Sequence, residues 1–476
     1  MLFQSPTFLV FFTIVVLVFA AGGAARWRKL VLILASCIFY MWWSPIFIFL
    51  LLGPMAIDFN VARWLERVDD LSRRRMLVTL SIVVNFGLLI FFKYYVFLAH
   101  NVLRLAQGFG FDVHWQPFDV TLPIGISFYT FERMSYTIDI YRRRARAASS
   151  LLDYSLFITF FPRLIAGPIV RAAEFLPQLR SKLALRFDAG IFFLLLRGLT
   201  KKVVVADNLS PFVERVLSAP GAWPSVVIWL GAIAFAAQIY CDFSGYSDMA
   251  IGLGRVFGLE LPQNFNHPYF SRNPSEFWRR WNMTLSFWLR DYLYISLGGN
   301  RSGKARTYVN QMITMLLGGL WHGANWSFML WGFLHGLALG VHRGLQDLGM
   351  LGRRASSSRL VRAVSIVVAQ YWVLLCWIPF RITDTPKMLT AVRKFVLFDG
   401  NFRLGDLGLG AMSLFSTILL LAAFVVLHAL SARSGGLDRL LSRLPLAAGL
   451  AVAFAAGIVL VVLWPLSEAP FIYFQF

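Results

Sequence analysis

The chain has 476 residues, of which 58% are hydrophobic and only 14% charged. A soluble protein of this length carries about 25% charged residues, so the composition excludes an ordinary soluble domain. The net charge of +21 could indicate a nucleic-acid partner. However, the basic residues cluster between apolar runs, as cytoplasmic loops of membrane proteins do, and no basic face carries stacking aromatic residues. We therefore predict a protein of the lipid bilayer that does not bind nucleic acid.

Several apolar runs reach the roughly 20 residues that cross a bilayer as a helix. They are continuously apolar and do not alternate, which predicts helices and excludes a β-barrel. We expect an all-α polytopic membrane protein with about 11 transmembrane helices. The clearest runs are Phe8–Gly22, Leu30–Gly53, Met76–Leu98, Val226–Gly254, Met412–Leu430 and Leu446–Trp464.

In the first third of the chain, charge indicates the direction of each predicted helix. The N-terminus lacks the basic region of a signal peptide, so a retained first helix is expected at about 7–23. Pro45 divides the next run into two short helices. Helices over 76–99 and 121–141 follow, joined by an outer loop at 100–120.

The middle of the chain is apolar but irregular. Three prolines interrupt residues 151–185, and residues 255–300 are polar and aromatic. Non-helical backbone is tolerated at membrane depth only where it is buried in protein or lines a cavity. We therefore expect re-entrant helices around a central funnel or tunnel.

No soluble domain and no fixed repeat divides the chain. It is interpreted as one integral membrane domain over residues 1–476. Its parts are N-terminal helices at 1–145, a catalytic core at 146–345 and C-terminal helices at 346–476.

Two strings resemble known motifs but lack their context. His114 and Asp119 form an HxxxxD string in a short loop, without the domain that surrounds it in soluble acyltransferases. Gly298–Lys304 matches the start of a phosphate-binding loop, but Ala305 replaces the hydroxyl residue that binds Mg²⁺. Neither is predicted to act in chemistry.

Polar residues inside apolar segments are a stronger signal, because ionisable groups are expensive there. Asp242 and Asp248 are expected to pair with basic residues, since buried charges need partners. Cysteines 37, 241 and 376 have no metal spacing and are expected to be small buried residues, so no metal site is predicted. The basic residues considered as partners are Arg279, Arg280 and Arg290.

His322 stands out among these polar residues. Glycines flank it, so backbone or a ligand can approach it closely. His335 lies about 220° away round an ideal helix, so the two are not expected to chelate one metal ion, and His335 can simply hydrogen-bond a neighbouring helix. Apolar surroundings disfavour the imidazolium, and a neutral imidazole can act as a general base. Without a GxSxG elbow, direct attack by an acceptor hydroxyl on a thioester is the simplest chemistry.

The chain resembles the membrane-bound O-acyltransferase (MBOAT) family, most closely its bacterial alginate O-acetylase branch. The resemblance covers long, ordered strings rich in Trp, Asn and His. They are GLTKKVVVADNL (198–209), YCDFSGYSDMAIGLGRVFG (240–258), LPQNFNHPY (261–269), SEFWRRWNMTLSFWLRDYLYISLGGNR (275–301), GGLWHGANWSFMLWGFLHG (318–336) and PFIYFQF (470–476).

The resemblance implies a ring of helices around a funnel and tunnel, in the bacterial cytoplasmic (inner) membrane. It implies His322 as the catalytic histidine and Asn282 as the residue that assists it. Acetyl-CoA is the implied acyl donor. An exported, alginate-like polysaccharide is the implied acceptor, and a periplasmic SGNH-hydrolase-like acetyltransferase is the implied partner. Residues expected to support the site or line the tunnel are Asp242, Ser244, Trp281, Trp321, Asn325 and His335.

Three alternatives stay open. The same fold could transfer D-alanine to teichoic acid, or acylate a lipid or a protein. A transporter also has broken helices and central polar groups, but its paired halves are not seen in this sequence. A scaffold that only docks a partner is the third alternative, against which intact His322 and Asn282 argue.

Overall fold

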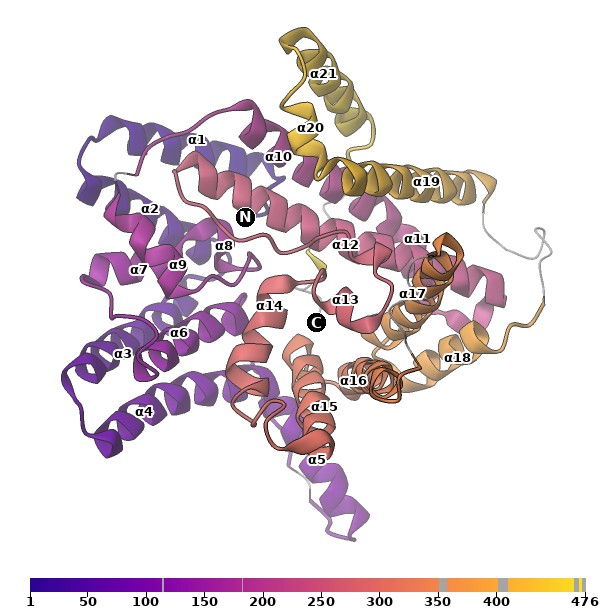
Figure 1. The fold of residues 1–476 in the computed structure, drawn as a ribbon, viewed down its shortest axis with the longest axis horizontal. Helices are drawn as coiled ribbons and strands as arrows, with labels where there is room; N and C mark the ends of the chain where they lie inside the picture. Colours follow the sequence, from indigo (N-terminus) through magenta and orange to yellow (C-terminus); the bar gives the residue numbers. More distant parts are fainter. Residues whose placement is uncertain (114, 182, 351–357, 401–409, 466–470, 473–476) are drawn as a thin grey trace. The chain divides into compact units, whose positions relative to one another are not determined.

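A computed structural model describes the whole chain except residues 114, 182, 351–357, 401–409, 466–470 and 473–476 (Figure 1). The described residues form helices and no strand, which confirms the predicted all-α class. The chain divides into two compact units. Unit 1 comprises Met1–Phe187 and Ala250–Pro262, and unit 2 comprises Asp188–Met249 and Gln263–Phe476.

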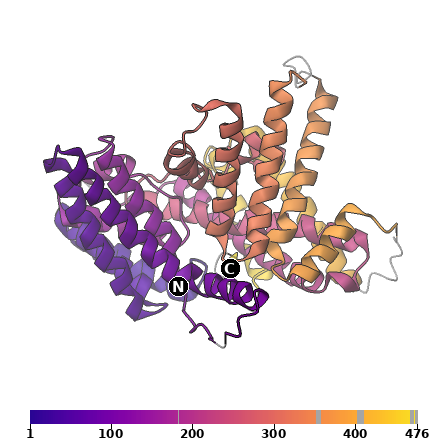
Figure 2. The same ribbon diagram turned by 90° about the horizontal axis from the view of Figure 1, so that it is seen from below.

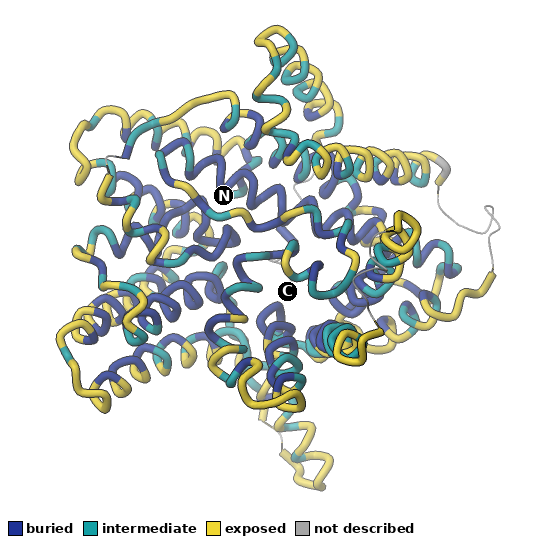
Figure 3. The backbone as a smooth tube through the Cα atoms, in the orientation of Figure 1, coloured by how far each residue is buried: buried dark blue, intermediate teal, exposed yellow. Residues whose placement is uncertain are grey.

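Among the described residues, five helices are long and apolar enough to cross a membrane. Their apolar side chains are widely exposed, as lipid-facing surfaces require. Helix α19 (Ala411–Ser434) is the most exposed, whereas α12 (Ser225–Val256) is mostly buried (Figure 3). The total of about 11 spans stays a prediction. The five helices are Pro45–Arg67, Leu71–Gly108, Ser225–Val256, Arg359–Arg381 and Met412–Ser434, and two shorter apolar helices are Pro6–Ala21 and Leu446–Val462.

Unit 1 is built from helices that follow the predicted order. Pro45 begins a short 3₁₀ turn between two helices, as expected. The helix predicted over 76–99 is longer, because a π-helical turn joins α4 to α5 without a break, and the outer loop predicted to start at 100 begins only after Gly108. The elements are α1 (Pro6–Ala21), α2 (Ala25–Met41), η1 (Pro45–Phe47), α3 (Ile48–Arg67), α4 (Leu71–Leu89), η2 (Ile90–Tyr94), α5 (Tyr95–Gly108), α6 (Ile126–Tyr141), α7 (Leu151–Thr159), α8 (Phe161–Leu164), α9 (Ala172–Phe175) and η3 (Leu176–Arg180).

A buried polar network joins α3, α4 and α6. The Asp58 carboxylate accepts hydrogen bonds from Ser81 Oγ at 2.6 Å and Asn85 Nδ2 at 2.9 Å. Arg133 Nε lies 3.9 Å from Asp58 Oδ2, and both side chains are fully buried. Thr137 Oγ1 lies 3.0 Å from Ser81 Oγ. These contacts fix the three helices against one another.

Arg74 ties two helix ends together at the basic edge of unit 1. Its guanidinium donates hydrogen bonds to the carbonyls of Leu65 and Val68, at the end of α3. It also donates to the carbonyls of Ile140 and Tyr141, at the end of α6. The last carbonyls of a helix have no partner inside it. Here the buried Arg74 supplies hydrogen bonds to carbonyls at the ends of both α3 and α6.

Unit 2 contains the irregular region that the sequence indicated. Between α12, which contributes residues to both units, and α15, the chain forms only short helical pieces. The elements are α10 (Ala189–Thr200), η4 (Lys201–Asp207), α11 (Asn208–Ser218), η5 (Pro220–Ala222), α12 (Ser225–Val256), η6 (Pro268–Phe270), α13 (Pro274–Trp278), α14 (Met283–Trp288), η7 (Leu289–Tyr294), α15 (Gly303–His322), α16 (Trp326–Asp347), α17 (Arg359–Arg381), α18 (Thr385–Val396), α19 (Ala411–Ser434), α20 (Leu437–Leu441) and α21 (Leu446–Val462).

Helices α15 and α16 form a tightly packed hairpin, and α17 packs beside α16 (Figures 1 and 2). Glycines allow the close approach. A Cβ on Gly319 would lie 2.2 Å from the Phe328 carbonyl oxygen, and one on Gly332 would lie 2.3 Å from that of Met315. The glycines near His322 were expected to let backbone or a ligand approach closely, and at Gly319 the backbone of α16 does so.

Candidate active site

His322 is the last residue of α15 and is 4% exposed. Three aromatic rings meet its imidazole edge to face: Trp321 at 4.9 Å, Trp331 at 4.8 Å and Phe380 at 5.1 Å between ring centroids. The ring is thus held in an apolar cage at the turn of the hairpin. Such surroundings favour a neutral imidazole over a charged one.

His335 lies on α16, so the two histidines do not share one helix as the 220° estimate assumed. The chain breaks at Gly323, the C-cap of α15, and Trp326 starts the second helix. The Trp331 ring lies 4.8 Å from both imidazoles. One indole therefore contacts both histidines.

Asn282 is held in a left-handed backbone conformation, with φ of 40° and ψ of 56°. This conformation is uncommon for residues other than glycine, and asparagine tolerates it best. The side chain is 1% exposed, and its Nδ2 has no hydrogen-bond partner among the described residues. A buried amide donor without a partner costs about 1–3 kcal/mol, which marks the position as a candidate functional site.

Asn264 shapes the turn that presents Asn282. Its side-chain oxygen accepts hydrogen bonds from the Thr284 backbone N–H at 3.2 Å and the Thr284 hydroxyl at 2.9 Å. Its backbone carbonyl accepts from the Met283 N–H at 2.9 Å. Sequence reasoning did not select Asn264, although it lies in the LPQNFN string of polar residues within an apolar region.

A stack of nearly parallel rings connects α16 to the Asn282 turn. His335 stacks on Phe277 at 5.9 Å with a 7° interplanar angle, and Phe277 stacks on Trp281 at 5.7 Å with 13°. Trp281 directly precedes Asn282 in the chain. His335 is 1% exposed, and its Nε2 has no hydrogen-bond partner in the part of the chain that the structure describes. Phe277 and Trp331 were not singled out in the sequence, and only the packing reveals that they join the predicted residues.

The buried aspartates of α12 are paired, but not with the arginines that were predicted. Lys202 Nζ lies 2.9 Å from Asp242, and Asp248 is bound by Arg197 and Lys201, each at 2.7 Å. The prediction was wrong because the basic string at the end of α10 packs on α12. The arginines named as partners have other neighbours: Arg280 pairs with Glu276 and Arg290 with Asp291.

Glu276 anchors the turn in front of Asn282. Burial alone would raise the pKa of its carboxyl. The backbone N–H and side chain of Arg272, together with Arg280, outweigh burial and hold that pKa below its ordinary value. Glu276 is therefore ionised at neutral pH and bridges two arginines.

The remaining residues named from the sequence lie at a helix cap, in the buried interior or outside the described residues. Asn325 caps α16 by accepting the Ser327 N–H at 2.9 Å, which explains its polar side chain. Ser244 and Trp321 are buried. The Ile472 N–H donates to Asp242 Oδ2 at 2.7 Å, which fixes the chain near its end. His114 and the remainder of the PFIYFQF string beyond Phe471 and Ile472 lie outside the described residues.

No group of His, Cys, Asp or Glu that could hold a metal ion occurs among the described residues. The GGNRSGK string runs into the start of α15 without a preceding strand in the part of the chain that the structure describes. The site is thus a cage of aromatic rings around one imidazole, joined through ring contacts to one buried amide.

Known proteins are similar to this chain in sequence over most of its length. A family model described as the membrane-bound O-acyltransferase family matches residues 140–348, which include Asn282, His322 and His335. The chain is 40% identical over 439 residues to the probable alginate O-acetylase AlgI of Azotobacter vinelandii, covering 90% of this chain and 84% of that protein. The chain belongs to the membrane-bound O-acyltransferase family.

Two further relatives show the range of this MBOAT group. The chain is 35% identical to the peptidoglycan O-acetyltransferase of Helicobacter pylori, covering 78% of this chain and 74% of that protein. It is 30% identical to the teichoic acid D-alanyltransferase of Streptococcus thermophilus, but over only 46% of this chain and 56% of that protein. The protein is thus a membrane-bound O-acyltransferase, and an acyl donor is its co-substrate.

Proposed function

We propose that this MBOAT protein moves acetyl groups from cytoplasmic acetyl-CoA across the bacterial inner membrane, for O-acetylation of an exported polysaccharide. One observation carries the choice of acetyl. The relatives named as O-acetylating enzymes match 90% and 78% of the chain, whereas the D-alanyltransferase matches 46%. An alginate-like polymer is the proposed acceptor, because the relative matched over 90% of the chain is named as a probable alginate O-acetylase.

His322 is proposed as the general base. Its imidazole takes the proton from an acceptor hydroxyl, whose oxygen attacks the thioester carbonyl. The carbon–oxygen bond forms, the carbon–sulfur bond breaks, and the leaving thiolate receives the proton back from the imidazole. The buried position of the ring in its aromatic cage supports this role, because apolar surroundings disfavour the imidazolium and leave the neutral base.

Asn282 is proposed to polarise the carbonyl of the donor. Its buried Nδ2 donor has no partner among the described residues, and the turn held by Asn264 keeps the backbone in place. A donor that is fixed before the reaction stabilises the developing oxyanion without reorganisation. Trp281 and His335 support this turn through the ring stack, and Trp321 encloses His322.

Asp242, Ser244 and Asn325 are proposed as supporting residues. The hydrogen bonds of Asp242 and Asn325 favour structural roles. A periplasmic SGNH-hydrolase-like acetyltransferase is the proposed partner that places the group on the polymer. D-alanyl transfer to teichoic acid is the alternative, which the more distant D-alanyltransferase relative favours.

The test uses the full-length protein in detergent with labelled acetyl-CoA and a crude exopolysaccharide extract. Release of free CoA and transfer of label are followed for the unaltered protein, His322→Ala and His342→Ala. His342 is a matched control, because it lies on the same hairpin and contacts only Gln346 at 3.2 Å among the hydrogen bonds of the described residues.

We expect the unaltered protein and His342→Ala to release CoA, and His322→Ala to be slower by about 10²- to 10⁴-fold. Equal rates for all three proteins would contradict the role of His322. Turnover of a D-alanyl thioester in place of acetyl-CoA would favour the alternative.

A further inference from the structure

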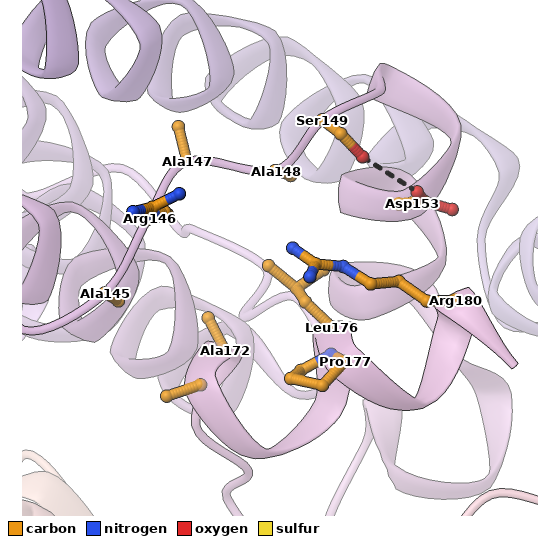
Figure 4. Close-up of a pocket in the computed structure, with 11 residues that line it drawn as sticks. Ala145, Arg146, Ala147, Ala148, Ser149, Asp153, Ala172, Leu176, Pro177 and Arg180 are labelled. Atoms are coloured by element: carbon orange, nitrogen blue, oxygen red, sulfur yellow. Dashed lines mark hydrogen bonds between the residues drawn. The ribbon is translucent and has the colours of Figure 1, made fainter.

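A pocket of about 190 Å³ lies in unit 1, outside the candidate active site (Figure 4). It is formed where the chain leaves α6, enters α7 and returns through α9 and η3. Two arginines reach it from opposite sides, Arg146 from the loop after α6 and Arg180 from the end of η3. The remaining wall consists largely of alanines, at positions 145, 147, 148, 172 and 173.

The acidic groups around this pocket are already engaged. Asp153 forms an ion pair with Lys29 at 2.5 Å and lies 3.4 Å from the Ser149 hydroxyl. Glu66 accepts the Ala147 backbone N–H at 2.5 Å. Each of these carboxylates therefore has a partner of its own.

The two pocket arginines differ from other cations at this edge of unit 1. Arg143 pairs with Asp69 at 2.6 Å, and Arg74 is bound to helix-end carbonyls. Arg146 and Arg180 have no side-chain hydrogen bond and no ion pair among the described residues. Two guanidinium groups thus face one small pocket, whose lining carboxylate, Asp153, is already paired with Lys29.

A guanidinium group presents a planar fork of N–H donors that matches the oxygens of a phosphate group. Alanine walls leave space between the two forks. Pockets for whole drug-sized ligands measure about 300–1,000 Å³, so this one suits a single phosphate group and not a complete nucleotide. Charge and size therefore agree on the same ligand chemistry.

We propose that this pocket binds a phosphate group, held between Arg146 and Arg180. The group belongs either to a soluble phosphate ester or to the headgroup of an anionic lipid, because the chemistry that recognises the two is the same. The site is independent of the acyltransfer chemistry assigned to unit 2.

Binding measurements on the full-length protein in detergent test whether the phosphate group belongs to a soluble ester. Binding of inorganic phosphate and of glycerol 3-phosphate is measured by titration, at low and at high salt. Native mass spectrometry tests whether the group belongs to an anionic lipid headgroup. It compares how much phosphatidylglycerol and phosphatidylcholine the same protein retains.

The variants Arg146→Gln and Arg180→Gln each remove one fork, and Ala173→Leu fills the pocket without changing charge. Arg144→Gln is the matched control, since it removes the same charge from the same loop but does not line the pocket. All four positions are exposed, so we expect the folded state to be preserved, and melting temperatures check this.

We expect the three pocket variants to bind about tenfold or more weakly, because charge-assisted hydrogen bonds are lost, while Arg144→Gln binds normally. If the soluble esters show this pattern, the ligand is a soluble phosphate ester. If only phosphatidylglycerol shows it, the ligand is a lipid headgroup. An equal loss in Arg144→Gln, or no binding of either kind by the unaltered protein, would overturn the proposal.

Discussion

In unit 1 the buried carboxylate of Asp58 receives hydrogen bonds from Ser81 and Asn85, whereas in unit 2 the equally buried Asn282 and His335 each keep one polar atom without a partner among the described residues. Both regions place polar groups among apolar side chains. The Asp58 carboxylate finds hydrogen-bond partners within the chain, although Asn85 Oδ1 and Arg133 Nε of the same network find none among the described residues. The Asn282 amide nitrogen also finds none there.

This difference distinguishes polar groups that hold the fold together from polar groups that are candidates for catalysis. A polar group that is buried and satisfied holds helices together at little cost, and Asp58 does so for α3, α4 and α6. A polar group that is buried without a partner costs about 1–3 kcal/mol. Such a group is a candidate for use by a substrate. The comparison therefore predicts that loss of the Asp58 carboxylate changes stability and that loss of the Asn282 amide changes catalysis.

The largest effect on stability is expected for Asp58→Ala. It leaves Arg133 buried without its carboxylate, so the free energy of unfolding should fall by about 3–5 kcal/mol. CoA release per folded molecule should stay unchanged. Thermal unfolding in detergent measures the first quantity. The double variant Asp58→Ala with Arg133→Leu should recover most of the lost unfolding free energy. An Asp58→Ala protein that melts normally but releases no CoA would contradict a purely structural role for Asp58.

Asn282→Gly tests the amide of the turn apart from its backbone. Glycine adopts a positive φ without strain, so only the side-chain donor is removed. We expect kcat/KM to fall by about 10²- to 10³-fold, with little change in melting temperature. Asn282→Ala should lose stability in addition, because alanine is strained at this φ. Normal activity in the glycine variant would show that Asn282 only shapes the turn.

His335 is expected to act through its ring and not through a proton. His335→Ala removes its ring contacts with Phe277, Trp278 and Trp331. Such pairs contribute about 0.5–1.5 kcal/mol each, so the free energy of unfolding should fall by about 1.5–4.5 kcal/mol and activity should fall with it.

His335→Phe keeps the stack and is the matched variant for this prediction. It should retain activity within about threefold, because no charged form of the ring is needed. If the phenylalanine variant melts normally but is as inactive as the alanine variant, the imidazole nitrogens take part in the reaction.

The smallest effect is expected for Glu276→Gln, and it should depend on pH. The folded-state pKa of Glu276 lies below its ordinary value of 4.5, so its ionised form stabilises the protein above that pH. This contribution is lost as pH falls through the lower, folded-state pKa. At pH 7 the variant should lose about 0.5–1.5 kcal/mol of unfolding free energy. Melting temperatures of both proteins should converge in acid, and a difference that persists there would contradict the ion pairs.

Much of the fold could be predicted from the sequence, because it depends on local patterns. Long apolar runs predicted membrane helices, and Pro45 predicted the turn between two of them. The polar and aromatic stretch over 255–300 predicted short, irregular pieces, which the structure shows. Local patterns failed where a helix continued through a π-helical turn, as it does beyond Ile90.

For the candidate site, sequence identified the residue types and tertiary structure decided their neighbours. His322 stood out because polar residues inside apolar strings are expensive, and Asn282 was implied by the resemblance to the MBOAT family. That Lys202 pairs with Asp242 depends on which helices pack together, and the same is true of Trp331, which contacts both histidines. Sequence alone therefore determined the membrane class, the family and the candidate residues. Contacts between distant segments decided which polar groups find a hydrogen-bond partner and which have none among the described residues, because partners are set by packing and not by order along the chain.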